Sequence, residues 1–173
     1  MLVADALREA TQADIAVMNG GGIRGNRLYP AGTVLKRRDI LTELPFGNTT
    51  VLVAITGRQV RALLETGFGE FGRPAGRFVQ ISGLTIRIDP DAPPGARIVS
   101  AEVGGEPLDE ARTYRVASNN FLYEGGNGYG LLAQGRTLVG ATDGGLVANA
   151  VIDYVARHAP IAVREGERIL VGR

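Results

Sequence analysis

The chain of 173 residues contains no cysteine, no tryptophan and a single histidine, His158. Without cysteine it can form neither disulfide bonds nor a thiolate metal site, although this leaves its redox compartment open. A catalytic zinc or dinuclear centre draws on several His, Asp or Glu side chains, so one histidine disfavours such a centre. His158 stands at the expected end of a helix, where histidine commonly interacts with free carbonyls, which also disfavours a Ser-His-Asp arrangement.

An excess of charge of one sign is missing too, because 19 Lys+Arg face 18 Asp+Glu for a net charge of +1. The longest run of like charge is Lys36-Arg37-Arg38, so we expect no nucleic-acid polymer as partner. No apolar run approaches the ~20 residues needed to cross a bilayer, and the N-terminal residues lack the pattern of a signal peptide. We therefore expect a soluble protein with no membrane partner, whose compartment the sequence leaves open.

Hydrophobic residues make up 45% and charged residues 21% of the chain, as in ordinary globular domains. The length fits one domain, and no repeat or linker divides residues 1–173. Hydrophobic periodicity predicts helices at residues 2–10 and 38–44, from Thr56-Gly57 onward, and at 143–158, with Leu146 facing inward. It predicts strands at 15–18, 49–55, 78–82, 84–89, 97–103, 113–118 and 168–171, and a loop at 67–76. The class is α+β, with a mixed or mainly antiparallel sheet packed with helices.

The segment Asn19-Gly-Gly-Gly-Ile-Arg24 follows the strand predicted at residues 15–18. Three glycines allow a ligand to approach peptide N–H groups closely, while Asn19 and Arg24 add an amide and a fixed cation. This pattern favours an anion-binding turn. The alternative is an ordinary tight turn between a strand and a loop.

Two phenylalanines lie in polar, turn-forming contexts outside any apolar stripe. Phe46 follows Pro45, and Phe121 follows Asn119-Asn120. One interpretation is that each ring packs its loop onto the core. The other is an aromatic clamp around a planar base, where stacking is typically worth about 1–3 kcal/mol per base. A base held there needs polar partners for its sugar, and Asn127 lies on the same loop as Phe121; alternatively, Asn127 is only a left-handed turn residue.

Several motifs occur together and in a fixed order along the chain. They are Asn19-Gly-Gly-Gly-Ile-Arg24, Leu44-Pro-Phe46-Gly-Asn48, Gly76-Arg-Phe-Val-Gln80-Ile-Ser-Gly83, Asn120-Phe121 and Gly125-Gly-Asn127-Gly-Tyr129. This set resembles the C-terminal domain of the 5′-nucleotidase family, metal-dependent enzymes that hydrolyse nucleoside 5′-phosphates and related nucleotides. The resemblance covers nearly the whole chain and implies the fold of that domain.

The resemblance also implies roles for the residues of these motifs. Phe46 and Phe121 would stack on the base, and Arg24 and Asn19 would contact phosphate and ribose. Asn48 and Gly76 would lie near the nucleoside. Asn127 stands where the family usually has aspartate, which keeps an acceptor oxygen for the ribose but removes the charge.

The family's N-terminal metallophosphatase domain, which carries the metal ligands and a catalytic His–Asp pair, is expected to be absent from residues 1–173. We therefore expect no cofactor in this chain, and divalent metals only in that missing domain, supplied in cis or in trans. Without metal, phosphate-ester hydrolysis loses its main electrostatic stabilisation, so we expect binding of a nucleotide or nucleoside without unaided hydrolysis. A full-length protein that follows the family would be periplasmic or extracellular. The alternatives are an interaction module that keeps the fold without the ligand, and a hydrolase in its own right.

Overall fold

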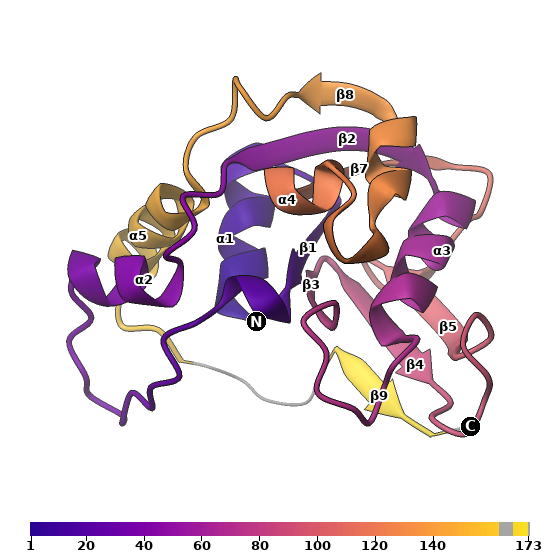
Figure 1. The fold of residues 1–173 in the computed structure, drawn as a ribbon, viewed down its shortest axis with the longest axis horizontal. Helices are drawn as coiled ribbons and strands as arrows, with labels where there is room; N and C mark the ends of the chain where they lie inside the picture. The colour runs from indigo at the N-terminus through magenta and orange to yellow at the C-terminus, as the bar shows by residue number, and fades with distance from the viewer. Residues whose placement is uncertain (163–167, 173) are drawn as a thin grey trace.

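The computed structural model describes residues 1–162 and 168–172. Within them the chain forms two β-sheets, of five strands in the order β3-β1-β7-β2-β8 and of four in the order β6-β5-β4-β9 (Figure 1). The strands are β1 (Ile15–Asn19), β2 (Thr50–Thr56), β3 (Val79–Ser82), β4 (Leu84–Ile88), β5 (Ile98–Val103), β6 (Glu106–Pro107), β7 (Thr113–Asn119), β8 (Arg136–Val139) and β9 (Ile169–Val171). The helices are α1 (Leu2–Thr11), α2 (Arg37–Glu43), α3 (Gly57–Phe68), α4 (Asn120–Tyr123) and α5 (Val147–His158), with 3₁₀ turns η1 (Gly20–Gly22), η2 (Gly126–Gly128) and η3 (Gly130–Gln134).

The pairing of the five-stranded sheet brings several chain segments to one of its edges. Strand β1 runs parallel to β7 and antiparallel to β3, while β2 runs antiparallel to β7 and β8. The carboxyl ends of β1 and β7 therefore meet at the same edge, where β2 and β3 begin. This is the kind of edge at which open α/β sheets bind ligands. The mixed pairing confirms the predicted α+β class.

Both faces of the five-stranded sheet are covered, so β1 is buried along its whole length. Alternation along the strand sends Ile15 and Val17 into a core shared with α3 and the four-stranded sheet. Ala16 and Met18 point the other way, into a core shared with α1, α2 and α5. One hydrophobic cluster thus joins the two sheets, because Val53 of the first and Ile86 of the second belong to it.

Helix α3 begins at the position that the sequence predicts. Thr56 is its N-cap: the Thr56 hydroxyl accepts a hydrogen bond from the Gln59 backbone N–H at 3.3 Å, and Gln59 Oε1 accepts one from the Thr56 backbone N–H at 2.9 Å. This reciprocal capping satisfies two of the N–H groups that a helix start leaves unpaired.

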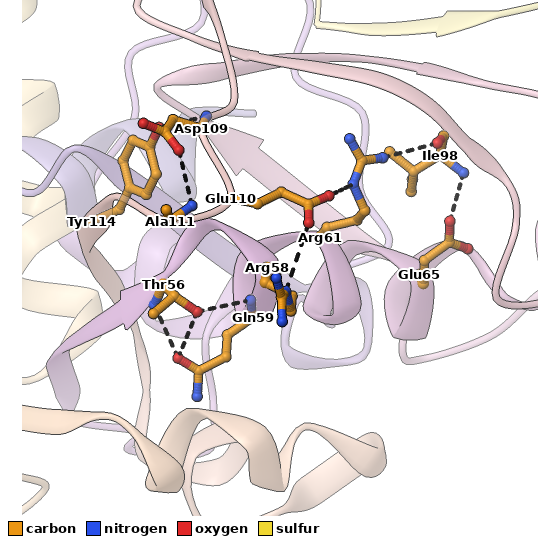
Figure 2. A network of polar contacts seen from close by, with 10 residues as sticks. All are labelled: Thr56, Arg58, Gln59, Arg61, Glu65, Ile98, Asp109, Glu110, Ala111 and Tyr114. Atoms are coloured by element: carbon orange, nitrogen blue, oxygen red, sulfur yellow. Dashed lines mark hydrogen bonds and ion pairs between the residues drawn. The ribbon is translucent and has the colours of Figure 1, made fainter.

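The same helix is tied to the four-stranded sheet by the polar network of Figure 2. Arg61 donates to Glu110 Oε1 at 3.0 Å and to the carbonyl of Ile98 at 3.1 Å. The Glu65 carboxylate accepts hydrogen bonds from the backbone N–H groups of Arg97 and Ile98, at 3.0 and 2.8 Å. These contacts hold β5 against α3 and fix the second sheet relative to the first.

The predicted helix at residues 143–158 is wrong at its start, because α5 begins at Val147. The Val147 N–H donates to the carbonyl of Asn48, and the Gly145 carbonyl accepts from the Thr50 N–H, so this segment pairs with the chain entering β2. Leu146, expected to face inward, is 41% exposed. The predicted loop at 67–76 also starts too early, since α3 continues to Phe68. Strand β8 and helix α4 were not predicted.

Candidate functional site

A cavity of about 450 Å³ lies at the sheet edge where β1 and β7 end, within the range of about 300–1,000 Å³ typical of ligand pockets. All seven site residues predicted from the sequence line it. The other two lining residues are Gly21 and Gly22 of the predicted glycine turn. The full lining is Asn19, Gly21, Gly22, Arg24, Phe46, Asn48, Gly76, Phe121 and Asn127. The structure therefore brings together residues from four separate segments of the chain.

The amide of Asn19, which ends β1, is oriented by Asn119, which ends β7. Asn119 Oδ1 accepts the N–H of Leu122 at 2.9 Å as the N-cap of α4, so its Nδ2 must act as a donor. That Nδ2 donates to Asn19 Oδ1 at 3.0 Å, with both residues buried. Asn19 Nδ2 hydrogen-bonds to no residue that the structure describes, and is the part of the side chain left for a ligand. Asn19 thus presents a donor to the cavity, which suits a phosphate or hydroxyl oxygen.

The glycines of turn η1 let its backbone lie close to the backbone of residues 76–78. The Gly20 N–H donates to the carbonyl of Phe78 at 2.7 Å, and the Gly21 N–H to that of Gly76 at 2.9 Å. A Cβ on Gly21 would lie 3.1 Å from Gly76 Cα, closer than side chains ordinarily come. These two N–H groups are used inside the chain, so the expectation that they approach an anion is wrong for both.

Arg24 is held by the last residue of α2, Glu43. The Arg24 N–H donates to the Glu43 carbonyl at 2.8 Å, while the Glu43 carboxylate accepts from the Gly25 N–H at 3.0 Å and the Tyr29 hydroxyl at 2.8 Å. The hydrogen bond to Glu43 raises the pKa of Tyr29 above its ordinary value. The Arg24 guanidinium carbon lies 5.5 Å from the centroid of the Phe46 ring, a cation–π distance.

Glu43 was not predicted as a site residue, although its position at the end of a helix indicates that its carboxylate has a partner. A carboxylate at the last position of a helix meets the negative end of the helix dipole, so it needs a partner elsewhere. Glu43 finds two such partners in the loop that follows Arg24.

Neither phenylalanine of the cavity is buried in the core, because Phe46 is 56% and Phe121 41% exposed. Phe46 stands between Pro45 and Gly47, whose φ of +64° suits a tight turn. The Phe121 ring lies over the backbone of Gly126, where an added Cβ would be 2.5 Å from the ring. The interpretation that each ring packs its loop onto the core is therefore wrong.

Asn127 lines the cavity from a left-handed turn, with a φ of +55°. Two residues later Tyr129 is 1% exposed, and its hydroxyl donates to the carbonyl of Arg77 at 2.8 Å. Burial raises the pKa of Tyr129 well above its ordinary value. This hydrogen bond fastens the loop that carries Asn127 to the segment that carries Gly76, so two parts of the cavity wall are joined.

His158 lies apart from this cavity. Its Nε2 is 2.7 Å from Glu9 Oε2 of α1, so it contacts a carboxylate rather than the helix carbonyls that the sequence predicted. Within residues 1–162 and 168–172, no three His, Cys, Asp or Glu side chains are grouped so as to hold a metal ion. Nor does any helix of this described part combine the length and hydropathy needed to span a membrane.

Comparison with known proteins places this chain in a family. The family model for the 5′-nucleotidase C-terminal domain matches residues 1–134. The chain therefore belongs to this family, as its motifs predicted. It is 33% identical over 132 residues to the trifunctional nucleotide phosphoesterase protein YfkN of Bacillus subtilis, covering 73% of this chain and 9% of that protein. It is 31% identical over 162 residues to protein UshA of Escherichia coli, covering 94% of this chain and 28% of that protein.

Solved structures show the same fold. The 5′-nucleotidase precursor from Thermus thermophilus superposes with a TM-score of 0.87 at 35% identity, over 98% of this chain and 34% of that one. The NAD nucleotidase of Haemophilus influenzae shares the fold at 22% identity, with a TM-score of 0.82, over 99% of this chain and 32% of that one. The chain thus spans about a third of each of these two structures. It spans 9% of YfkN and 28% of UshA.

Proposed function

We propose that this chain is the nucleotide-recognition part of a 5′-nucleotidase-type hydrolase of nucleotide catabolism. In this proposal residues 1–173 form one domain, which binds a nucleotide or nucleoside in the cavity at the sheet edge. One observation carries it: the seven residues predicted from separate motifs line a single cavity of about 450 Å³. Membership of the 5′-nucleotidase C-terminal domain family supports it.

The base stacks between Phe46 and Phe121. Both rings are substantially exposed while lining the same cavity, which is costly unless a ligand or partner covers them. Stacking on aromatic rings is worth about 1–3 kcal/mol per base and tolerates any base. Asn48 and Gly76 line the wall beside the nucleoside.

The phosphate and ribose meet the polar side of the cavity. The guanidinium of Arg24 binds phosphate oxygens with paired N–H donors, and Asn19 Nδ2 adds a donor whose direction Asn119 fixes. The Asn127 amide oxygen accepts a hydrogen bond from a ribose hydroxyl. Each group then matches the hydrogen-bonding capacity of the atoms it faces.

Hydrolysis requires a metallophosphatase domain, in cis or in trans, that holds the divalent metals. Such metals activate water and neutralise charge on the phosphoryl group. The relatives are several times longer than this chain, which supports a partner domain of this kind. The chain alone is expected to release no phosphate from AMP, with or without added divalent metal.

Calorimetric titration with AMP, adenosine and inorganic phosphate tests the proposal. We expect AMP to bind more tightly than adenosine, and both to lose about tenfold or more in affinity in Phe46→Ala and in Phe121→Ala. Phe71→Ala, which removes a ring outside the cavity, serves as the control and should bind both ligands like the wild type. Unchanged affinity in both cavity variants would contradict the aromatic clamp.

A second candidate function is an interaction module that keeps the fold without the ligand. The loop after Arg24 favours it, because Leu28 is 92% and Val34 80% exposed. This function predicts self-association or partner binding that Leu28→Ser with Val34→Ser abolishes, and no response to nucleotide. A monomer at every concentration in light scattering, together with nucleotide binding, would exclude it.

A further inference from the structure

A second, smaller hollow of about 220 Å³ adjoins the cavity beside Phe46. It shares Gly22, Phe46 and Asn48 with that cavity, so the two hollows lie side by side at these residues. We call it the apolar side pocket. Its lining consists of Met18, Gly22, Leu41, Leu44, Pro45, Phe46, Gly47, Asn48, Leu146, Val147 and Ala148.

The side chains that line the apolar side pocket are hydrophobic, with one exception. Its inner wall includes Met18, Leu44 and Val147, which are buried, and its rim holds Leu41 and Leu146, which are 43% and 41% exposed. Every residue of the described chain that lines it is uncharged, and Asn48 carries its one polar side chain. A charged or strongly polar group placed there would lose its hydration without gaining partners.

We propose that the apolar side pocket binds an uncharged apolar group, up to the size of one six-membered ring, carried on the base of the nucleotide in the adjoining cavity. This inference rests on the proposed function and specifies its substrate class. The ligands are nucleosides and nucleotides whose base bears a branched alkyl or aromatic substituent.

The size of the pocket and its position beside the cavity both support this occupant. A cavity of about 150 Å³ lined by aliphatic and aromatic side chains takes up benzene, so 220 Å³ accommodates one ring or a branched five-carbon chain. A base held against Phe46 lies next to the residues that the two hollows share, so a substituent on its edge has only these residues to pass to reach the side pocket. A second nucleoside phosphate does not suit the pocket, because Asn48 carries the one polar side chain, and none of the described lining residues carries a charge, to meet its sugar and phosphate oxygens.

The test compares adenosine with adenosine carrying a dimethylallyl group on N6, or a phenyl group at C2 or C8, by calorimetric titration. At least one substituted nucleoside should bind about tenfold or more tightly than adenosine, because its apolar group is buried. Ala148→Leu fills the pocket without touching the cavity, and should abolish this gain while leaving adenosine affinity unchanged. Ala156→Leu, the same change at an exposed position of α5, is the matched control and should keep the gain.

The outcomes separate the two proposals. If adenosine binds but no substituted form binds more tightly, the apolar side pocket does not bind base substituents and the proposed function stands. A gain that persists in Ala148→Leu places the substituent elsewhere and overturns the inference. If Ala148→Leu instead abolishes self-association seen by light scattering, a second copy of the chain occupies the pocket, which also overturns it. Failure of adenosine itself to bind contradicts the proposed function, and the inference with it.

Discussion

Asn119 Nδ2 donates to Asn19 Oδ1 at 3.0 Å, and this contact decides which end of the Asn19 amide faces the cavity. Asn19→Asp keeps an acceptor for Asn119 but replaces the free N–H₂ donor with a carboxylate oxygen. We expect AMP affinity to fall at least about tenfold, and adenosine affinity to fall less, because the new charge repels phosphate. Calorimetry measures both. Asn26→Asp adds the same charge on an exposed loop and should change neither affinity; an unaltered AMP-to-adenosine ratio in Asn19→Asp would place the phosphate elsewhere.

Glu43 positions Arg24 without lining the cavity. Glu43→Ala removes the acceptor for the Gly25 N–H and the Tyr29 hydroxyl, and should weaken AMP binding about fivefold through the freed loop. Glu43→Gln retains an acceptor oxygen and should restore most of the affinity. A merely structural role predicts instead that adenosine and AMP lose affinity equally in Glu43→Ala, since only AMP carries the group proposed to contact Arg24.

Gly126 lies beneath the Phe121 ring, so it controls where that ring stands. In Gly126→Ala the new methyl group displaces the ring, and adenosine affinity should fall about as far as in Phe121→Ala. The ring is partly exposed and free to rotate away, so the free energy of unfolding in urea should change by about 1 kcal/mol or less. Gly130→Ala on the same loop makes only ordinary contacts and should bind adenosine normally. Normal binding by Gly126→Ala would argue against a fixed Phe121 platform.

Tyr129 links stability to alkaline pH. Its folded pKa lies above the ordinary value of 10.0 because the hydroxyl is buried. Below pH 10 Tyr129 is protonated in both the folded and the unfolded chain, so its contribution to stability does not change with pH. Above pH 10 the tyrosine ionises first in the unfolded chain, so this contribution falls by about 1.4 kcal/mol per pH unit until the folded pKa is reached.

Tyr129→Phe should remove the part of the alkaline slope that is due to Tyr129, at a cost of about 1 kcal/mol near neutral pH for the lost hydrogen bond to Arg77. Urea unfolding of both proteins, near neutral pH and again above pH 10, measures the difference. Equal loss of stability with pH in the two proteins would show that Tyr129 ionises as freely folded as unfolded.

The sequence could predict five of the seven cavity residues because each stands out locally, whereas Asn48 and Gly76 were expected only from the family resemblance. Phe46 and Phe121 are aromatic residues among polar, turn-forming neighbours, and Arg24 follows a run of glycines. Nothing local reveals that Asn119 orients Asn19, because that contact joins residues 100 positions apart. The Glu43 tether likewise depends on how the loop after Arg24 folds back against α2.

The misplaced start of α5 has a similar cause. The apolar stripe of the helix begins at Leu146, and the glycines at 144 and 145 before it disfavour a helix. Asp143 and Gly144 lie in a turn, while the hydrogen bonds from the Thr50 N–H to the Gly145 carbonyl and from the Val147 N–H to the Asn48 carbonyl hold Gly145 and Leu146 beside the chain that enters β2. Strand β8 escaped prediction because it is a short sheet edge, identified by its pairing with β2 rather than by its own residues. Pairing with residues distant in the sequence thus determines the backbone in both places.

The parallel pairing of β1 with β7 sets an order of events during synthesis. Asn19 emerges from the ribosome about a hundred residues before its neighbour Asn119 and the loop of Asn127. The walls of the cavity therefore cannot come together before residue 127 has been made, and the proposed nucleotide binding has to wait until then.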